Sequence, residues 1–106
     1  MIGFDTALVR KADELLARCR MRKATIATAE SCTGGMIAAL LTSISGSSES
    51  FDRAFVTYSN QAKMEMLGVS PELLNAHGAV SSQCAAEMVE GALARSTATL
   101  AVSVTG

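Results

Sequence analysis

The sequence has little charge, few aromatic residues and a single proline. Of its 106 residues, 18% are charged and 49% are hydrophobic, with no Trp, one Tyr and three Phe. This balance excludes a disordered chain, and a core without large rings must be built from aliphatic side chains and methionine. Such a core leaves few voids only when helices and sheet approach closely. We therefore expect one globular domain over residues 1–106, with alanine-rich helices packed on a sheet.

Long basic and long apolar runs are also missing. The formal net charge is −1 and the basic residues are scattered, which argues against nucleic acid as a partner. The longest apolar stretches, such as Met36–Leu41, fall far short of the roughly 20 residues that cross a bilayer. The N-terminus carries acidic residues where a signal peptide has a basic and then an apolar run. We therefore predict a cytoplasmic protein with no membrane contact.

The sequence lacks the residue clusters that hold metals. Its one histidine, His77, precedes Gly78 at the end of a predicted helix, where it is expected to meet helix carbonyls. The three cysteines, Cys19, Cys32 and Cys84, are far apart and form no CxxC pair, so we expect reduced, buried thiols. Cys32 as a nucleophile is the less favoured alternative, because no histidine lies near it in sequence. We predict no metal site and no cofactor.

The hydrophobic pattern alternates between helical and strand periods. The predicted helices cover residues 8–20, 36–41, 61–67, 71–77 and 82–93, and the predicted strands cover residues 25–29, 54–58 and 99–104. This order predicts an α/β fold, with a mostly parallel or mixed sheet between helices and ligands at the carboxyl ends of the strands. Three strands leave at least one edge unpaired, so we expect either a fragment or a sheet completed by a partner chain.

The loop from Glu30 to Gly35 follows the first predicted strand and precedes an apolar helix. Its small residues, hydroxyls and helix N-terminal amides are typical of an anion site. It is not a Walker A loop, because that spacing and its lysine are absent. The alternative is a capped helix start whose glycines allow close packing of strand and helix, and composition does not decide between the two.

Tyr58, Asn60 and Lys63 lie at the end of the next predicted strand. If Asn60 caps the following helix, Lys63 falls in its first turn, where the helix dipole disfavours a cation without an anion nearby. Such a lysine could act as a general base toward a serine hydroxyl, as in Ser-Lys hydrolases, or be an ordinary solvated lysine. The turn at residues 46–48 could add hydroxyls to a site or be only a turn.

Six motifs, in this order, resemble those of the CinA C-terminal domain family. They are TAESCTGG at 28–35, GSS at 46–48, YSN at 58–60 with Lys63, LGV at 67–69, AHGAVS at 76–81 and AVSVTG at 101–106. The resemblance runs from about residue 24 to the last residue. It implies a three-layer α/β/α sandwich and nicotinamide-nucleotide amidase activity, which converts nicotinamide mononucleotide and water to nicotinate mononucleotide and ammonia.

The resemblance also implies roles for individual residues. Ser31 is the expected nucleophile, Lys63 its base, and Tyr58 a group that orients or assists proton transfer. Ser48 is an alternative nucleophile. The residues expected to bind the substrate's phosphate, ribose or oxyanion are Thr33, Gly34, Gly35, Ser48, Asn60 and Thr105.

Domains of this family continue beyond the last matched motif with a Gly/Pro-rich loop, further strands and a helix. We therefore expect residues 1–106 to form the N-terminal two-thirds of the usual domain, in its stand-alone form because an amphipathic helix begins soon after Met1. The alternatives to an active amidase are a non-catalytic nucleotide-binding or regulatory domain and an inactive fragment. Surfaces this apolar also predict a homo-oligomer.

Overall fold

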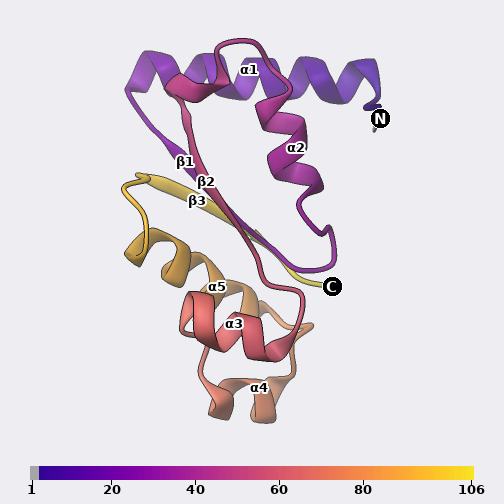
Figure 1. Cartoon of the computed structure of the whole chain (residues 1–106), viewed down its shortest axis with the longest axis vertical. Helices are drawn as coiled ribbons and strands as arrows, with labels where there is room; N and C mark the ends of the chain where they lie inside the picture. The colour runs from indigo at the N-terminus through magenta and orange to yellow at the C-terminus, as the bar shows by residue number, and fades with distance from the viewer. Residues whose placement is uncertain (1–2) are drawn as a thin grey trace.

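The computed structural model describes residues 3–106 as helices and strands in alternation (Figure 1). The elements are α1 (Thr6–Arg22), β1 (Ile26–Glu30), α2 (Met36–Thr42), the 3₁₀ turn η1 (Ser47–Glu49), β2 (Phe51–Val56), α3 (Asn60–Leu67), α4 (Pro71–His77), α5 (Ser82–Ala94) and β3 (Leu100–Val104). Every predicted helix and strand is present.

The three strands form one parallel sheet in the order β2-β1-β3. Helices α1 and α2 cover one face of the sheet, and α3, α4 and α5 lie on the other (Figure 1). The central strand β1 is buried at all of its residues, whereas β2 and β3 each have a free edge. The expected α/β fold is confirmed, with a small, open sheet that is parallel rather than mixed.

Strand β2 differs from the prediction at both ends. It spans Phe51–Val56 instead of residues 54–58. The sequence pattern favoured a buried apolar strand, but β2 is an edge strand with exposed residues. Asp52 and Arg53 of this strand form an ion pair of 2.6 Å. Because an edge strand can carry polar residues, its sequence does not show the continuous apolar run of a buried strand.

The helix ends follow the expected capping chemistry with one correction. Ser59, not Asn60, caps α3, because its side chain accepts a hydrogen bond of 3.0 Å from the Ala62 amide. Asn60 is instead the first helical residue. Gly68 ends α3 with a left-handed φ of 69°, as predicted from its position after the last apolar residue.

Two apolar clusters hold the layers together. Ile26 of β1 packs with α1 and α2, while Ala29 of the same strand packs with α3 and α5 on the opposite face. At Gly91, α5 approaches α3 so closely that a Cβ atom would lie 2.0 Å from the Leu67 carbonyl oxygen. Side chains larger than hydrogen therefore do not fit at this crossing.

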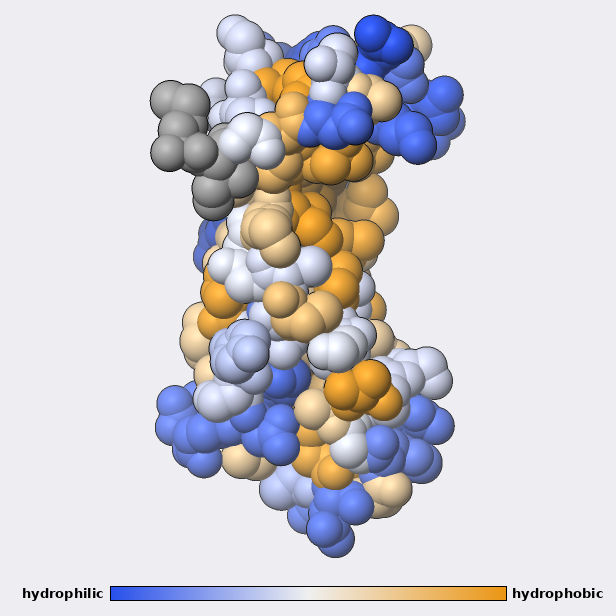
Figure 2. Space-filling model, turned by 90° about the vertical axis from the view of Figure 1, so that its right-hand side faces the viewer, coloured by the Kyte–Doolittle hydropathy of each residue, from blue (hydrophilic) through white to orange (hydrophobic). Residues whose placement is uncertain are grey.

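An apolar groove lies beside β3 on the face that carries α1 and α2. It has a volume of about 380 Å³ and is lined by side chains of α1, β1, α2 and β3. Leu100 and Val102 of β3 are each 46% exposed there. Figure 2 shows hydrophobic residues gathered below the polar residues of α1. This face of β3 therefore has no helix over it within residues 3–106.

Candidate functional site

The candidate site lies at the carboxyl edge of the sheet, where all three strands end. Ser31 follows β1, Tyr58 follows β2 two residues after its end, and Thr105 follows β3. Backbone hydrogen bonds tie these ends together: the Ser31 amide donates to the Val104 carbonyl at 2.9 Å, and the Thr57 amide donates to the Glu30 carbonyl at 2.9 Å. This edge is where ligands gather in open α/β sheets.

Lys63 is buried at this edge. It lies in the first turn of α3, its side chain is only 1% exposed, and its Nζ donates a hydrogen bond of 3.0 Å to the Tyr58 carbonyl. Within residues 3–106 the ion pair between Asp52 and Arg53 is the only one, so Lys63 has no carboxylate partner there. Buried charges are ordinarily paired. Lys63 is therefore a buried amine with spare hydrogen-bonding capacity, beside the segment that follows β2.

The three cysteines do not form a reactive group with Lys63. Cys84 and Cys19 are buried as expected, whereas Cys32 is exposed, contrary to prediction. Burial raises the pKa of the Cys84 thiol, and the nearby positive charge of Lys63 only partly opposes this effect. Cys84 is therefore a neutral neighbour of Lys63 rather than a thiolate.

Glu30 is a residue of this region that the sequence motifs did not single out. Its side chain is fully buried, and it accepts hydrogen bonds from Thr33 Oγ1 at 2.7 Å and from the Ile37 and Ala38 amides at 2.9 and 3.0 Å. Burial raises the pKa of Glu30, but these hydrogen bonds, with one from the Gly35 amide, outweigh it and lower the pKa. The sequence held one indication of this role: Glu30 is an acidic residue shortly before a helix, where a negative charge is favourable.

The loop after Ser31 uses most of its donors within the chain. The Gly34 amide donates to the Ser31 carbonyl at 3.0 Å, and Thr33 Oγ1 and the Gly35 amide donate to Glu30. The Glu30 carboxylate is thus an internal anion at the start of α2. The Thr33 hydroxyl and the Gly34 amide, two of the donors expected to hold the substrate, already have partners.

Ser48 does not lie near Ser31 within this chain. It is an exposed residue of η1, directly before β2, and the neighbouring Ser50 carbonyl accepts a hydrogen bond of 2.7 Å from the Ile26 amide at the start of β1. The length of β1, about 13 Å at about 3.3 Å per residue, therefore separates the region of Ser48 from Ser31. The expectation that the two serines share a site is not met here.

The remaining predicted residues border the carboxyl edge in different ways. The Tyr58 side chain is 75% exposed, and Asn60 lines a shallow hollow between α3 and α4. Thr105 Oγ1 donates to the Ala79 carbonyl at 2.7 Å, which ties the end of β3 to the segment before α5. Ser31, Lys63, Tyr58 and Thr105 are thus brought to one edge of the sheet.

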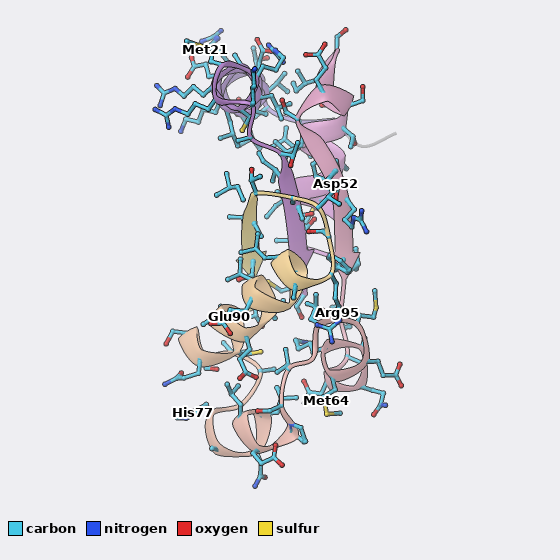
Figure 3. The ribbon with its side chains drawn as sticks, turned by 90° about the vertical axis from the view of Figure 1, so that its left-hand side faces the viewer. Met21, Asp52, Met64, His77, Glu90 and Arg95 are labelled. Carbon is cyan, nitrogen blue, oxygen red and sulfur yellow. The ribbon has the colours of Figure 1, made fainter. Side chains whose placement is uncertain are left out.

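Residues 3–106 contain neither a metal-binding cluster nor a helix that could span a membrane. Within this range, no three or more His, Cys, Asp and Glu side chains are grouped so that they could hold a metal ion. His77 is the last residue of α4, as predicted, and it points away from the sheet (Figure 3). In the same range, no helix is both long enough and apolar enough to span a membrane.

Fold and site together define an α/β protein with a serine and a buried lysine at the carboxyl edge of a parallel sheet. A model of the CinA C-terminal domain matches residues 9–106. The chain belongs to the CinA C-terminal domain family.

Among named relatives, the chain is similar to the nicotinamide-nucleotide amidohydrolase PncC of Escherichia coli (strain K12). The identity is 48% over 102 residues, which cover 96% of this chain and 62% of the relative. It is also 54% identical over 85 residues to a putative competence-damage inducible protein of Caldicellulosiruptor bescii, covering 80% of this chain and 21% of that protein. The chain thus spans less than two-thirds of these relatives.

Solved structures agree with this assignment. The competence/damage inducible protein CihA of Agrobacterium tumefaciens has a TM-score of 0.96 at 49% identity, covering 100% of this chain and 64% of that one. A CinA superfamily protein of Escherichia coli has a TM-score of 0.93 at 34% identity, covering 99% and 62% of the two chains.

Proposed function

We propose that this chain is the N-terminal two-thirds of a nicotinamide-nucleotide amidase domain that acts in the cytoplasm in pyridine nucleotide recycling. The observation that carries the proposal is the buried, unpaired Lys63 at the same sheet edge as Ser31. The 48% identity to a nicotinamide-nucleotide amidohydrolase supports the proposed substrate, nicotinamide mononucleotide. A nucleophile and an adjacent base are the minimum that covalent hydrolysis of an amide requires.

In the proposed mechanism, Ser31 Oγ attacks the carboxamide carbon while the Lys63 amine takes the hydroxyl proton. The tetrahedral intermediate then expels ammonia, which receives that proton, and an ester remains on Ser31. Water attacks the ester with Lys63 again as base and releases nicotinate mononucleotide. The exposed Tyr58 stands at the open side of this edge, where it can orient the substrate. No step requires a metal or cofactor.

Two alanine substitutions separate the candidate nucleophiles Ser31 and Ser48. Ser31→Ala is expected to lower formation of nicotinate mononucleotide by at least about 10³-fold, because removal of a nucleophile leaves only binding and oxyanion stabilisation. Ser48→Ala is expected to retain most of the rate, because Ser48 lies at the amino ends of the strands, away from Ser31 at their carboxyl ends. Chromatography of the reaction mixture measures both. Loss of the product in Ser48→Ala and not in Ser31→Ala would contradict the assignment.

We also propose that these 106 residues, without the further strands and helix of the usual domain, form a homo-oligomer in which a second copy covers the groove beside β3. The support is the free edge of β3 next to a groove whose lining side chains are apolar except for Lys11. An unpaired strand edge beside an apolar surface favours association with another chain.

A charge placed in the groove tests this assembly. Val102→Glu is expected to give a single chain in light scattering coupled to size exclusion, because burial of an unpaired carboxylate costs several kcal/mol. Met21→Glu is the matched control, since Met21 is 85% exposed at the end of α1 and does not line the groove (Figure 3). A wild-type protein of one chain, or an unchanged assembly in Val102→Glu, would contradict the proposal.

A further inference from the structure

Glu30 fills the N-terminus of α2 from inside the protein. Its Oε1 accepts from Thr33 Oγ1 and the Ile37 amide, and its Oε2 accepts from the Ala38 amide. These helix N-terminal amides are the groups that bind an external anion in many α/β proteins. Because the carboxylate is fully buried and already holds them, a substrate phosphate or oxyanion does not bind there.

The same contacts fix the loop that carries Ser31. Glu30 precedes Ser31 directly, and its side chain holds Thr33 and the start of α2, so the intervening residues are anchored at both ends. The Ser31 amide is fixed in turn by the Val104 carbonyl. Within residues 3–106, the backbone amides of Cys32 and Thr33 donate to no other group. These two amides, next to the proposed nucleophile Ser31, are therefore available to bind a substrate oxygen.

We propose that Glu30 is a positioning residue for the reaction at Ser31, and that it leaves the amides of Cys32 and Thr33 as the donors to the oxyanion. This inference rests on the proposed function. The amide directly after a nucleophile serves as an oxyanion donor in α/β-hydrolases, where the nucleophile also follows a strand and precedes a helix. Fixed donors stabilise the transition state because they need no reorganisation during the reaction.

The kinetic test compares Glu30→Gln with Glu90→Gln, an exposed glutamate on α5 (Figure 3). Glu30→Gln keeps the shape but loses the charge and places an amide group against the helix donors. We expect kcat to fall by at least about tenfold with little change in KM, less than the 10²- to 10³-fold that follows loss of an oxyanion donor itself. Formate added to Glu30→Ala is expected to restore part of kcat. An unchanged kcat in folded Glu30→Gln would overturn the inference.

A measurement that does not depend on catalysis separates this inference from the proposed function. In the wild type, the amide proton resonances of Ile37 and Ala38 are expected to move as the pH falls below 4.5, because Glu30 ionises below that ordinary value. Since its folded pKa is lowered, Glu30 stabilises the fold above pH 4.5, and this contribution is lost as the pH falls through the folded pKa. Glu30→Gln is expected to abolish both responses.

The resonances of the loop itself decide the positioning role. Glu30→Gln is expected to shift the Cys32 and Thr33 amide resonances, whereas Glu90→Gln leaves them in place. If the wild type releases no ammonia, the proposed function fails while this measurement still applies. Unchanged Cys32 and Thr33 resonances in Glu30→Gln would overturn the positioning role, and shifted ones would support it.

Discussion

Lys63→Met is expected to lower kcat for nicotinamide mononucleotide hydrolysis by about 10²- to 10⁴-fold, the range that a general base contributes. The methionine side chain fills nearly the same volume but cannot take the proton of Ser31. KM is expected to change far less, because the base acts on the transition state rather than on the bound substrate. Steady-state kinetics of the purified variant measure both constants.

The stability of Lys63→Met distinguishes a catalytic lysine from a structural one. Lys63 is buried with a single hydrogen-bond partner, the Tyr58 carbonyl, so an apolar replacement is expected to leave the free energy of unfolding unchanged or to raise it. Lys23→Met, at an exposed lysine that directly follows α1 and does not line the groove, is the control and should leave kcat unchanged. Retention of more than about one-tenth of kcat in Lys63→Met would remove Lys63 as the base.

Gly91→Ala is expected to lower the free energy of unfolding by about 3 kcal/mol, the upper part of the usual range for overpacking. An added Cβ would lie 2.0 Å from the Leu67 carbonyl oxygen and 2.7 Å from its carbon. These are backbone atoms at the end of α3, so relief requires movement of a helix rather than of a side chain. This clash outweighs the gain of about 1 kcal/mol from alanine's higher helix propensity.

Urea unfolding followed by circular dichroism measures the effect of Gly91→Ala. Glu90→Ala is the matched control, because Glu90 is an exposed residue beside Gly91 on α5 and its replacement changes helix propensity without a clash. An unfolding midpoint of Gly91→Ala at or above that of the wild type would show that α3 and α5 do not cross this closely.

The architecture was predictable because local chemistry marks each element. Apolar spacing predicted α1, Gly68 predicted the end of α3, and Ser70 with Gly78 predicted both ends of α4. Strand β2 was misplaced because its exposed Asp52 and Arg53 belong to an edge, and sequence does not reveal which strand occupies an edge.

The candidate site was predictable only in part, since it depends on strand direction and on side-chain orientation. Ser48 precedes β2 and Tyr58 follows it, so the six residues of β2 separate them. Ser48 therefore lies at the amino ends of the strands, whereas Ser31 lies with Tyr58 at the carboxyl ends. The burial of Lys63 and the reach of Glu30 into α2 arise from packing between elements, which periodicity and motifs do not describe.

Ammonia release from nicotinamide mononucleotide by the purified 106-residue chain is the most direct test of an amidase centred on Ser31. Steady release that Ser31→Ala abolishes, with the fold of the variant intact by circular dichroism, is the expected result. A folded wild-type chain that binds the nucleotide and releases no ammonia, or equal release by Ser31→Ala, would contradict it.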